Sequence, residues 1–418
     1  MTIFDELESE VRSYCRSWPV VFDTAIGSRL TDVDGNSYLD FFAGAGTLNY
    51  GHNPPALKKP LIDYLQRDGV THGLDIHTTA KAEFLQTFRE VVLEPRGLDY
   101  KVQFPGPTGA NAVESALKLA RKITGREAVI NFTNAFHGMT LGALSVTGNS
   151  MKRGGAGVPL VHATPMPYDN YFDGTVPDFL WFERVLDDQG SSLNDPAAVI
   201  VETVQGEGGV NPARAEWLHG LAELCKRHGI LLIVDDVQMG IGRTGPFFSF
   251  EFADIQPDIV CLSKSISGYG LPMALVLMKR EHDEWDPGEH NGTFRGNNPA
   301  FVTATAALRE YWTDDMLEKG TIAKGERIEE HLSRLAEAAS PLELTPKGRG
   351  LARGLAFGQA ELAGKACTAA FERGLLMETA GPCDEVMKLM PPLTMTEDEL
   401  DEGLAIVTDA VHCVATGA

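Results

Sequence analysis

The stretch "PDIVCLSKSISGYGLPMALVLMKR", residues 257–280, decides the fold of this chain. A run of β-branched and other apolar residues ends abruptly at Lys264, and a glycine-rich turn then leads into a second apolar run over 271–278. Such runs are typical of strands that are buried on both faces. Lysine is rarely fully buried, because burying an unpaired charge costs free energy. Lys264 therefore indicates either a side chain that extends to solvent or a functional site.

Apolar runs of the same kind recur upstream, and helical patterns separate them. The runs are "AAVIVETV" (197–204) and "ILLIVDD" (230–236), with the helical pattern "AEWLHGLAELCKRHG" (215–229) between them. A further helix is predicted over 109–126, where the apolar residues Val113, Ala116, Leu117 and Ala120 share one face. This alternation predicts an α/β fold with a large, mostly parallel sheet that is covered by helices on both faces.

The character of the sequence changes near residues 50 and 310. Before residue 50 we predict a helix and a hairpin, "GSRLTDVDGNSYLDF", which turns at Asp34-Gly35. After residue 310, long charged helices alternate with a few strands. We therefore expect an N-terminal segment (1–50) that joins a small domain, a large domain (51–310) and a C-terminal small α+β domain (311–418).

The charge of the chain bears on its partners. The 418 residues carry a net charge of −22, which disfavours nucleic acid as a partner. No stretch approaches the about 18 apolar residues of a membrane span, so we expect no membrane partner. The acidic N-terminus is unlike a secretory signal. Six scattered cysteines without metal-like spacing predict reduced thiols in the cytoplasm and no metal site.

Three predicted strands end in polar side chains, namely Glu202, Asp235 and Lys264. The carboxyl ends of parallel strands meet at one edge of a sheet, where ligands bind. Gly109 and Ala110 open a helix whose free N–H groups suit a phosphate. A phosphate cradle, an acid and a lysine together indicate pyridoxal 5′-phosphate (PLP), which needs a lysine and a carboxylate. Taken singly, the same residues also fit a helix cap, a magnesium site and a surface lysine.

Seven stretches follow one another along nearly the whole chain. They are "DVDGNSYLDFFAGAGTLNYGHNPP" (32–55), "TGANAVESALKLAR" (108–121), "NAFHGMTLGALSVTG" (134–148), "VETVQGEGGV" (201–210), "VDDVQMGIGRTG" (234–245), "HNGTFRGNNPA" (290–300) and "KLMPPLTMTEDELDEGL" (388–404). In this order the stretches resemble the motifs of the class III (ω-amino acid) aminotransferases. The resemblance implies the fold type I of PLP-dependent aminotransferases, PLP as cofactor, and transfer of an amino group from a small-molecule donor to a 2-oxo acid. It also implies a homodimer at least, with sites at the subunit interface.

The resemblance assigns roles to single residues. Lys264 and Asp235 are implied to be catalytic: Lys264 binds the cofactor covalently and then moves the proton, and Asp235 pairs with the pyridine nitrogen. The other implied cofactor contacts are Gly109 and Ala110 at the phosphate, Phe136 and Val237 on the ring faces, Gln238 at the phenolic oxygen and Thr293 at the phosphate of the other subunit. A core position for Phe136 and a turn position for Thr293 remain alternatives.

Two departures from the family pattern concern substrate binding. Met139 stands where several family members use an arginine for a distal carboxylate, and Lys388 stands where many use an arginine for the α-carboxylate. Lysine is a point charge without the bidentate fork of arginine. We predict substrate contacts from Glu202, Glu207, Lys388 and Arg295. A surface ion pair remains the alternative for Arg295.

Other functions remain open on this scaffold. One group comprises ω-aminotransferases that act on ornithine, acetylornithine or 4-aminobutyrate. Another is a PLP-dependent aminomutase or racemase, which would need no 2-oxo acid. A third is a binding protein without enzymatic activity, against which the combination of Lys264, Asp235 and Gln238 argues.

Overall fold

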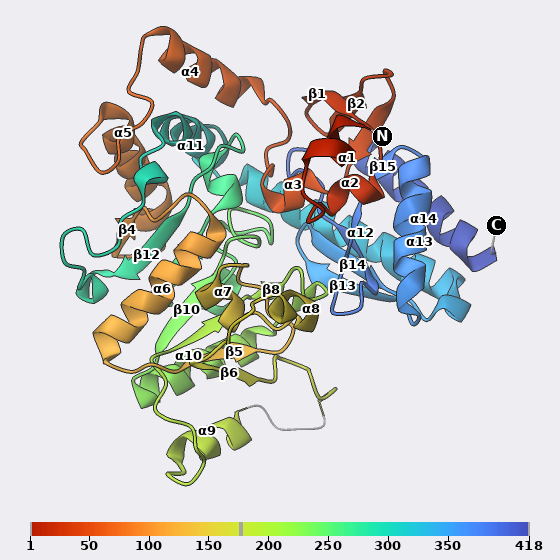
Figure 1. Ribbon diagram of the computed structural model, residues 1–418. Helices are drawn as coiled ribbons and strands as arrows, with labels where there is room; N and C mark the ends of the chain where they lie inside the picture. The colour runs from red at the N-terminus through yellow and green to blue at the C-terminus, as the bar shows by residue number, and fades with distance from the viewer. Residues whose placement is uncertain (1, 175–178, 417–418) are drawn as a thin grey trace.

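The computed structural model describes residues 2–174 and 179–416. A seven-stranded sheet forms the centre of the larger part of the molecule (Figure 1). Its strands, in spatial order, are β4 (Tyr100–Gln103), β12 (Leu275–Lys279), β11 (Ile259–Leu262), β10 (Leu231–Asp235), β7 (Ala198–Val201), β5 (Val129–Phe132) and β6 (Ala163–Met166). Strands β11, β10, β7, β5 and β6 run parallel to one another. The predicted α/β fold with a mostly parallel sheet is therefore confirmed.

Helices cover both faces of this sheet. Successive residues of a strand point to opposite faces, so each strand contributes side chains to both helical layers. On β10, Leu232 and Val234 belong to a core shared with α5 (Thr79–Phe88), α10 (Ala215–His228) and α11 (Asn298–Tyr311). Leu231 and Ile233 belong to a separate core shared with α6 (Gly109–Thr124). Both faces of the strand are apolar for this reason, and the sequence shows a continuous apolar run.

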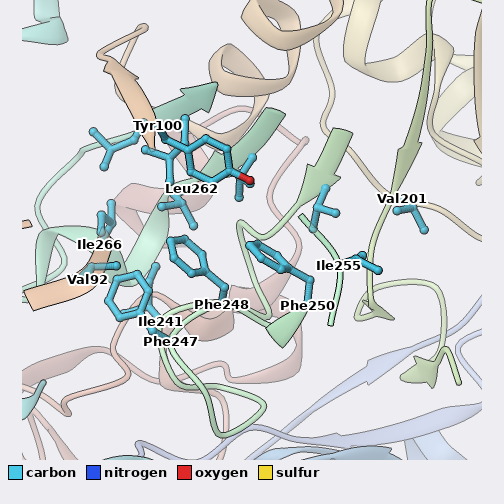
Figure 2. Close-up of a cluster of buried hydrophobic side chains, with 14 of the residues drawn as sticks. Val92, Tyr100, Val201, Ile241, Phe247, Phe248, Phe250, Ile255, Leu262 and Ile266 are labelled. Carbon is cyan, nitrogen blue, oxygen red and sulfur yellow. The ribbon is translucent and has the colours of Figure 1, made fainter. Parts of the chain in front are cut away.

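The first of these cores is rich in aromatic side chains. Figure 2 shows Phe247, Phe248 and Phe250 packed beneath Leu262 and Ile266, which flank the end of β11. Phe247 and Phe248 meet edge to face, with ring centroids 4.9 Å apart. This packing supports the short segment that carries Lys264, the η4 turn (Lys264–Ser267).

One strand departs from the parallel arrangement. The second apolar run of the opening stretch forms β12, which is antiparallel to both β11 and β4. Parallel strands require a crossover of roughly a dozen residues, usually a helix. The twelve residues between β11 and β12 form the η4 turn and a glycine-containing loop but no helix that crosses over the sheet, and the chain reverses direction.

Local predictions are also confirmed. The predicted helix α6 begins after Thr108, whose side chain accepts a hydrogen bond from the Asn111 N–H, and ends at Gly125 in the left-handed conformation. The predicted hairpin comprises β2 (Arg29–Asp32) and β3 (Ser37–Asp40), which pair in antiparallel fashion. Gly35 has a φ of 86° at its turn, where residues with a side chain would be strained.

The C-terminal part has its own sheet and core. An antiparallel sheet has the order β13 (Thr345–Arg349), β14 (Ala352–Ala356), β17 (Val386–Leu389) and β16 (Glu378–Ala380). The helices α12 (Met316–Ala338), α13 (Ala360–Glu372) and α14 (Glu397–Thr416) pack on it. This core also includes Leu39 and Phe41 from the N-terminal region.

The N-terminal region is tied to the C-terminal part by a mixed sheet. Its order is β1 (Phe22–Ile26), β2, β3 and β15 (Leu375–Leu376), with β15 parallel to β3. On these grounds we propose domain boundaries near residues 50 and 310. None of the described helices combines the length and apolar composition needed to cross a membrane.

The remaining short elements connect these parts. They are α1 (Ile3–Leu7), α2 (Tyr14–Ser17), α3 (Ala43–Gly46), α4 (Pro55–Gln66), α7 (Leu141–Ser145), α8 (Ser150–Gly154), α9 (Leu180–Asp187), the pair β8 (Val204–Gln205) and β9 (Asn211–Pro212), and the turns η1 (Arg89–Leu93), η2 (Glu94–Arg96), η3 (Glu251–Ala253), η5 (Arg280–His282), η6 (Thr293–Arg295) and η7 (Ser340–Leu342). Of these, α2, α3 and η6 bear on the site.

Candidate active site

A cavity of about 180 Å³ lies at the carboxyl ends of β7, β10 and β11. The three strands are neighbours in the sheet, so the polar residues that end them come together as predicted. The lining residues are Gly109, Ala110, Phe136, His137, Gly138, Glu202, Glu207, Asp235, Val237, Gln238, Met239 and Lys264. Most of the predicted site residues therefore share one cavity.

Lys264 stands at the end of β11 in a conformation that is unusual for a lysine. Its φ is 52°, in the left-handed region, and such strain is typical of functional sites. Its Nζ donates a hydrogen bond of 2.7 Å to the carbonyl oxygen of Ala45, which lies in α3. Burial lowers the pKa of Lys264 to about 8, and the charge of Lys388 acts in the same direction. The neutral amine is therefore far more populated near neutral pH than in an ordinary lysine.

Asp235 ends β10 and faces the cavity, where it pairs with His137. The distance between Asp235 Oδ2 and His137 Nδ1 is 2.7 Å, and Asp235 Oδ1 accepts a hydrogen bond from the Val237 N–H. Burial alone would lower the pKa of His137, but the hydrogen bond and charge of Asp235 raise it. The hydrogen bond with His137 therefore holds the Asp235 carboxylate in place at the cavity. The sequence analysis missed His137, although it stands directly after Phe136 in the "NAFHG" stretch.

The neighbouring carboxylate, Asp236, points the other way. Its Oδ2 accepts a hydrogen bond from the Ser249 N–H at 3.0 Å, and its side chain is fully buried. Burial raises the pKa of Asp236 to about 7. Adjacent strand residues face opposite sides of a sheet, which explains why only Asp235 lines the cavity.

Glu202 ends β7 and supports the wall of the cavity. Its Oε2 accepts a hydrogen bond from the backbone N–H of Phe136, at 3.0 Å. Burial raises the pKa of Glu202 to about 7. This bond orients Phe136, whose aromatic ring also lies 4.3 Å from the ammonium of Lys152.

The N-terminus of α6 forms a narrow cradle at the cavity. A Cβ atom at Gly109 would lie 2.8 Å from Val237 Cγ1, and one at Gly138 would lie 2.8 Å from Ala110 Cβ. Only glycine fits at these two positions. The first N–H groups of a helix are free to bind an anion, and the helix dipole favours negative charge there. A phosphate cradle, a lysine with a lowered pKa and a carboxylate at the cavity all fit PLP.

Glu207 connects the cavity to a buried ion pair. Its Oε1 accepts hydrogen bonds from Lys388 Nζ at 2.7 Å and from Gln238 Nε2 at 3.1 Å. Burial would raise the pKa of Glu207, but the charges of Lys388 and Lys264 lower it to about 2. Lys388 is 1% exposed and lies behind Glu207, outside the lining of the cavity. It also lies 2.7 Å from Glu378, a residue that the sequence analysis missed.

Besides Lys388, two more predicted residues lie outside the cavity of their own chain. The carbonyl oxygen of Thr293 is 2.7 Å from His72 Nε2, and Arg295 forms an ion pair with Asp75. Neither residue lines the cavity. The surface ion pair was the alternative expected for Arg295. Met139 is 54% exposed, so it lies at the surface of the single chain.

Comparisons with known proteins agree with this geometry. Residues 13–411 match the aminotransferase class-III family. The chain therefore belongs to the class III aminotransferases, which are PLP-dependent enzymes, and PLP is its cofactor. Its substrates are accordingly amino and oxo acids.

Individual relatives are similar to this chain over nearly its whole length. A protein of Streptomyces anulatus named diaminobutyrate–2-oxoglutarate transaminase is 68% identical over 412 residues, which cover 99% of this chain and 98% of that protein. A protein of the same name from Halalkalibacterium halodurans is 58% identical over 99% of this chain and 97% of its own length. Among solved structures, ornithine aminotransferase from Toxoplasma gondii superposes with a TM-score of 0.85 at 27% identity, covering 99% of this chain and 94% of that chain.

Proposed function

We propose that this enzyme transfers the 4-amino group of L-2,4-diaminobutyrate to 2-oxoglutarate, which yields aspartate 4-semialdehyde and glutamate. The observation that carries this proposal is the set of relatives with this activity in their names, which are 56–68% identical over 97–99% of the chain. The stretches "FPGPTGANAVESALKLARK" (104–122) and "GLPMALVLMKREHDEWDPGEHNGTFRGNNPAF" (270–301) resemble the same enzyme of ectoine biosynthesis. A role in osmoadaptation belongs to the proposal.

The cavity offers a place for each part of the cofactor. Bound PLP supplies an electrophilic carbon and a ring that withdraws electrons from the substrate. We assign Gly109 and Ala110 to its phosphate, Asp235 to its ring nitrogen and Gln238 to its phenolic oxygen. Phe136 and Val237 are assigned to the two ring faces. These assignments rest on the common cavity and on the family motifs.

Lys264 is the proposed base and acid of the reaction. Transamination needs a group that removes a proton from one carbon and returns it to another. The pKa of about 8 makes the amine of Lys264 available in its neutral form. Its hydrogen bond to the Ala45 carbonyl holds the nitrogen in the cavity. Asp235, held in place by His137, is proposed to face the ring nitrogen.

Lys388 is the proposed partner of the 2-oxoglutarate carboxylate next to the reacting carbon. Glu207 pairs with Lys388 at 2.7 Å and would mask this charge between the two half-reactions. The second carboxylate of 2-oxoglutarate needs another cation. Arg295 remains the proposed cation, and it would have to come from the partner subunit because it lies outside the cavity of its own chain.

A homodimer is part of the proposal. Thr293 would reach the phosphate of the partner's site, which accounts for its place outside the cavity of its own chain. Large apolar side chains are exposed around η6 and on α4 and the loop after it: Ile62, Leu65, Val70, Leu74, Ile76 and Phe294. Exposed apolar groups of this kind are typical of an interface. Sedimentation velocity of the purified enzyme should show no monomer at micromolar concentration, and a monomeric active enzyme would contradict the dimer.

The activity itself is tested with a panel of amino donors. The purified enzyme with PLP is incubated with diaminobutyrate, ornithine, acetylornithine or 4-aminobutyrate together with 2-oxoglutarate, and glutamate formation is measured. We expect the fastest glutamate formation with diaminobutyrate. Mass spectrometry of the trapped product should identify aspartate 4-semialdehyde. Finding 4-amino-2-oxobutyrate, or a reaction without 2-oxo acid, would refute the proposal.

A further inference from the structure

Lys388, Glu207 and Glu378 form a buried group of charges beside the cavity, which we call the charge cluster. Lys388 and Glu378 are opposite each other on β17 and β16, and their side chains are 1% and 10% exposed. Lys388 Nζ lies 2.7 Å from Glu207 Oε1 and 2.7 Å from Glu378 Oε1. Two carboxylates therefore face one ammonium group, and the fully ionised cluster has an excess negative charge.

Glu378 is the less satisfied of the two carboxylates. Its Oε1 is buried and has no hydrogen bond from any described residue, because the contact with Lys388 is an ion pair without hydrogen-bond alignment. Glu207, by comparison, accepts aligned bonds from Lys388 and Gln238. Burial also raises the pKa of Glu378, whereas that of Glu207 is lowered. A buried, incompletely paired carboxylate is costly unless a further cation or donor completes it.

We propose that Glu378 is a specificity residue that binds the second ammonium group of a diamino acid donor. This inference rests on the proposed function. When the terminal nitrogen of the donor is at the reacting position, its other end carries an ammonium group. Glu378 supplies the complementary negative charge, held 2.7 Å from Lys388.

The charge cluster adjoins the cavity through Glu207, which lines it together with Lys264. The charges of Glu207, Lys388 and Glu378 all act on the pKa of Lys264. Burial and the negative charges of Glu378 and Glu207 raise the pKa of the Tyr14 hydroxyl, from α2. The same negative charge disfavours donors whose non-reacting end carries a carboxylate but no ammonium group, such as 4-aminobutyrate. Selection by an unfavourable contact with the wrong ligand is a common source of specificity.

The test compares donors that differ only in the second ammonium group. For Glu378→Gln, kcat/KM for diaminobutyrate should fall about 10- to 100-fold, the range expected when a hydrogen bond between charged groups is lost. The value for 4-aminobutyrate should stay unchanged or rise, and KM for 2-oxoglutarate should fall. Glu378→Asp should retain part of the preference. Glu385→Gln, a matched control near the start of β17, should behave as wild type.

Equal losses with both donors, or a higher KM for 2-oxoglutarate in Glu378→Gln, would mean that Glu378 only holds Lys388 in place, and would overturn the inference. Thermal unfolding verifies that the variants are folded. If the wild-type enzyme prefers ornithine, the proposed function fails, but the ratio of ornithine to 5-aminopentanoate then tests Glu378 in the same way. An unchanged ratio would again overturn the role of Glu378.

Discussion

Two buried lysines, one at the end of the large sheet and one in the hairpin β16–β17, have opposite electrostatic environments. Lys264 donates to the neutral carbonyl of Ala45, and burial lowers its pKa to about 8. Lys388 lies between two carboxylates, whose charges outweigh burial and raise its pKa. The pairing of a buried lysine, rather than its burial, therefore decides whether it is neutral or charged.

This difference separates the tasks of the two regions. The ends of β7, β10 and β11 offer an amine with a lowered pKa, a carboxylate and a helix N-terminus, to which we assign the chemistry in the proposed function. The hairpin β16–β17 offers a positive charge enclosed by negative charges, to which we assign the recognition of charged substrates. Changes at the first region should abolish turnover, and changes at the second should alter stability and substrate preference.

The largest effect is expected for Lys264→Ala. Turnover should fall by about 10⁴-fold or more, because the nucleophile and the proton-transfer group are lost together. The variant should still fold, since the hydrogen bond of Lys264 Nζ goes to the neutral Ala45 carbonyl and its loss leaves no carboxylate unpaired. Glutamate formation at saturating substrate measures the loss, with Lys279→Ala as the control. Wild-type turnover in Lys264→Ala would break the comparison of the two lysines.

Asp235→Asn should cause the next largest loss. A neutral amide cannot stabilise a protonated ring nitrogen, and we expect kcat to fall by about 10²- to 10³-fold. Asp236→Asn is the matched control, because Asp236 faces away from the cavity and accepts from the Ser249 N–H. Its kcat should change by a few-fold at most. If Asp236→Asn lost more activity than Asp235→Asn, the assignment of the cavity carboxylate at the end of β10 would be wrong by one residue.

Lys388→Ala should act mainly on stability and on substrate affinity. Removing the ammonium leaves two buried carboxylates unpaired, which should cost about 3–5 kcal/mol in the free energy of unfolding. KM for 2-oxoglutarate should rise more than KM for diaminobutyrate, whose ammonium keeps Glu378 as a partner. Denaturant titration and steady-state kinetics measure both, with the exposed Lys365→Ala as control. If Lys388→Ala lost no more stability than Lys264→Ala, the two lysines would not differ in their contribution to stability.

The smallest effect concerns pH and Asp236. Its folded-state pKa of about 7 lies above the ordinary value of 3.8, so the folded protein holds this proton more tightly than the unfolded chain does. Stability should therefore fall as pH rises from about 4 to 7. Asparagine cannot ionise. The Tm of Asp236→Asn relative to that of wild type should therefore be several degrees higher at pH 8 than at pH 5. The exposed Asp254→Asn should show no such gain.

Much of the large domain could be predicted because its signals are local. The continuous apolar runs of β10 and β11 reflect two covered faces, and Val113 and Ala116 mark the buried face of α6. Asp235 and Lys264 directly follow such runs, so their place at the sheet edge follows from strand length alone. The antiparallel direction of β12 was less evident. The sequence alone does not show whether the residues between β11 and β12 cross over the sheet or reverse the chain.

The sequence by itself determined which side chains end the strands, since chain connectivity and side-chain alternation are local properties. Only the tertiary structure decided which charges meet. His137 reaches Asp235 across 98 residues of chain, and Lys388 reaches Glu207 across 181. Glu378 faces Lys388 through the register of the hairpin, and a shift by one residue would turn it to the other face of the sheet. The ion pair of Arg295 with Asp75 likewise joins distant segments of one chain. Such pairings depend on packing between distant segments, and the resulting electrostatics set the pKa of each buried group.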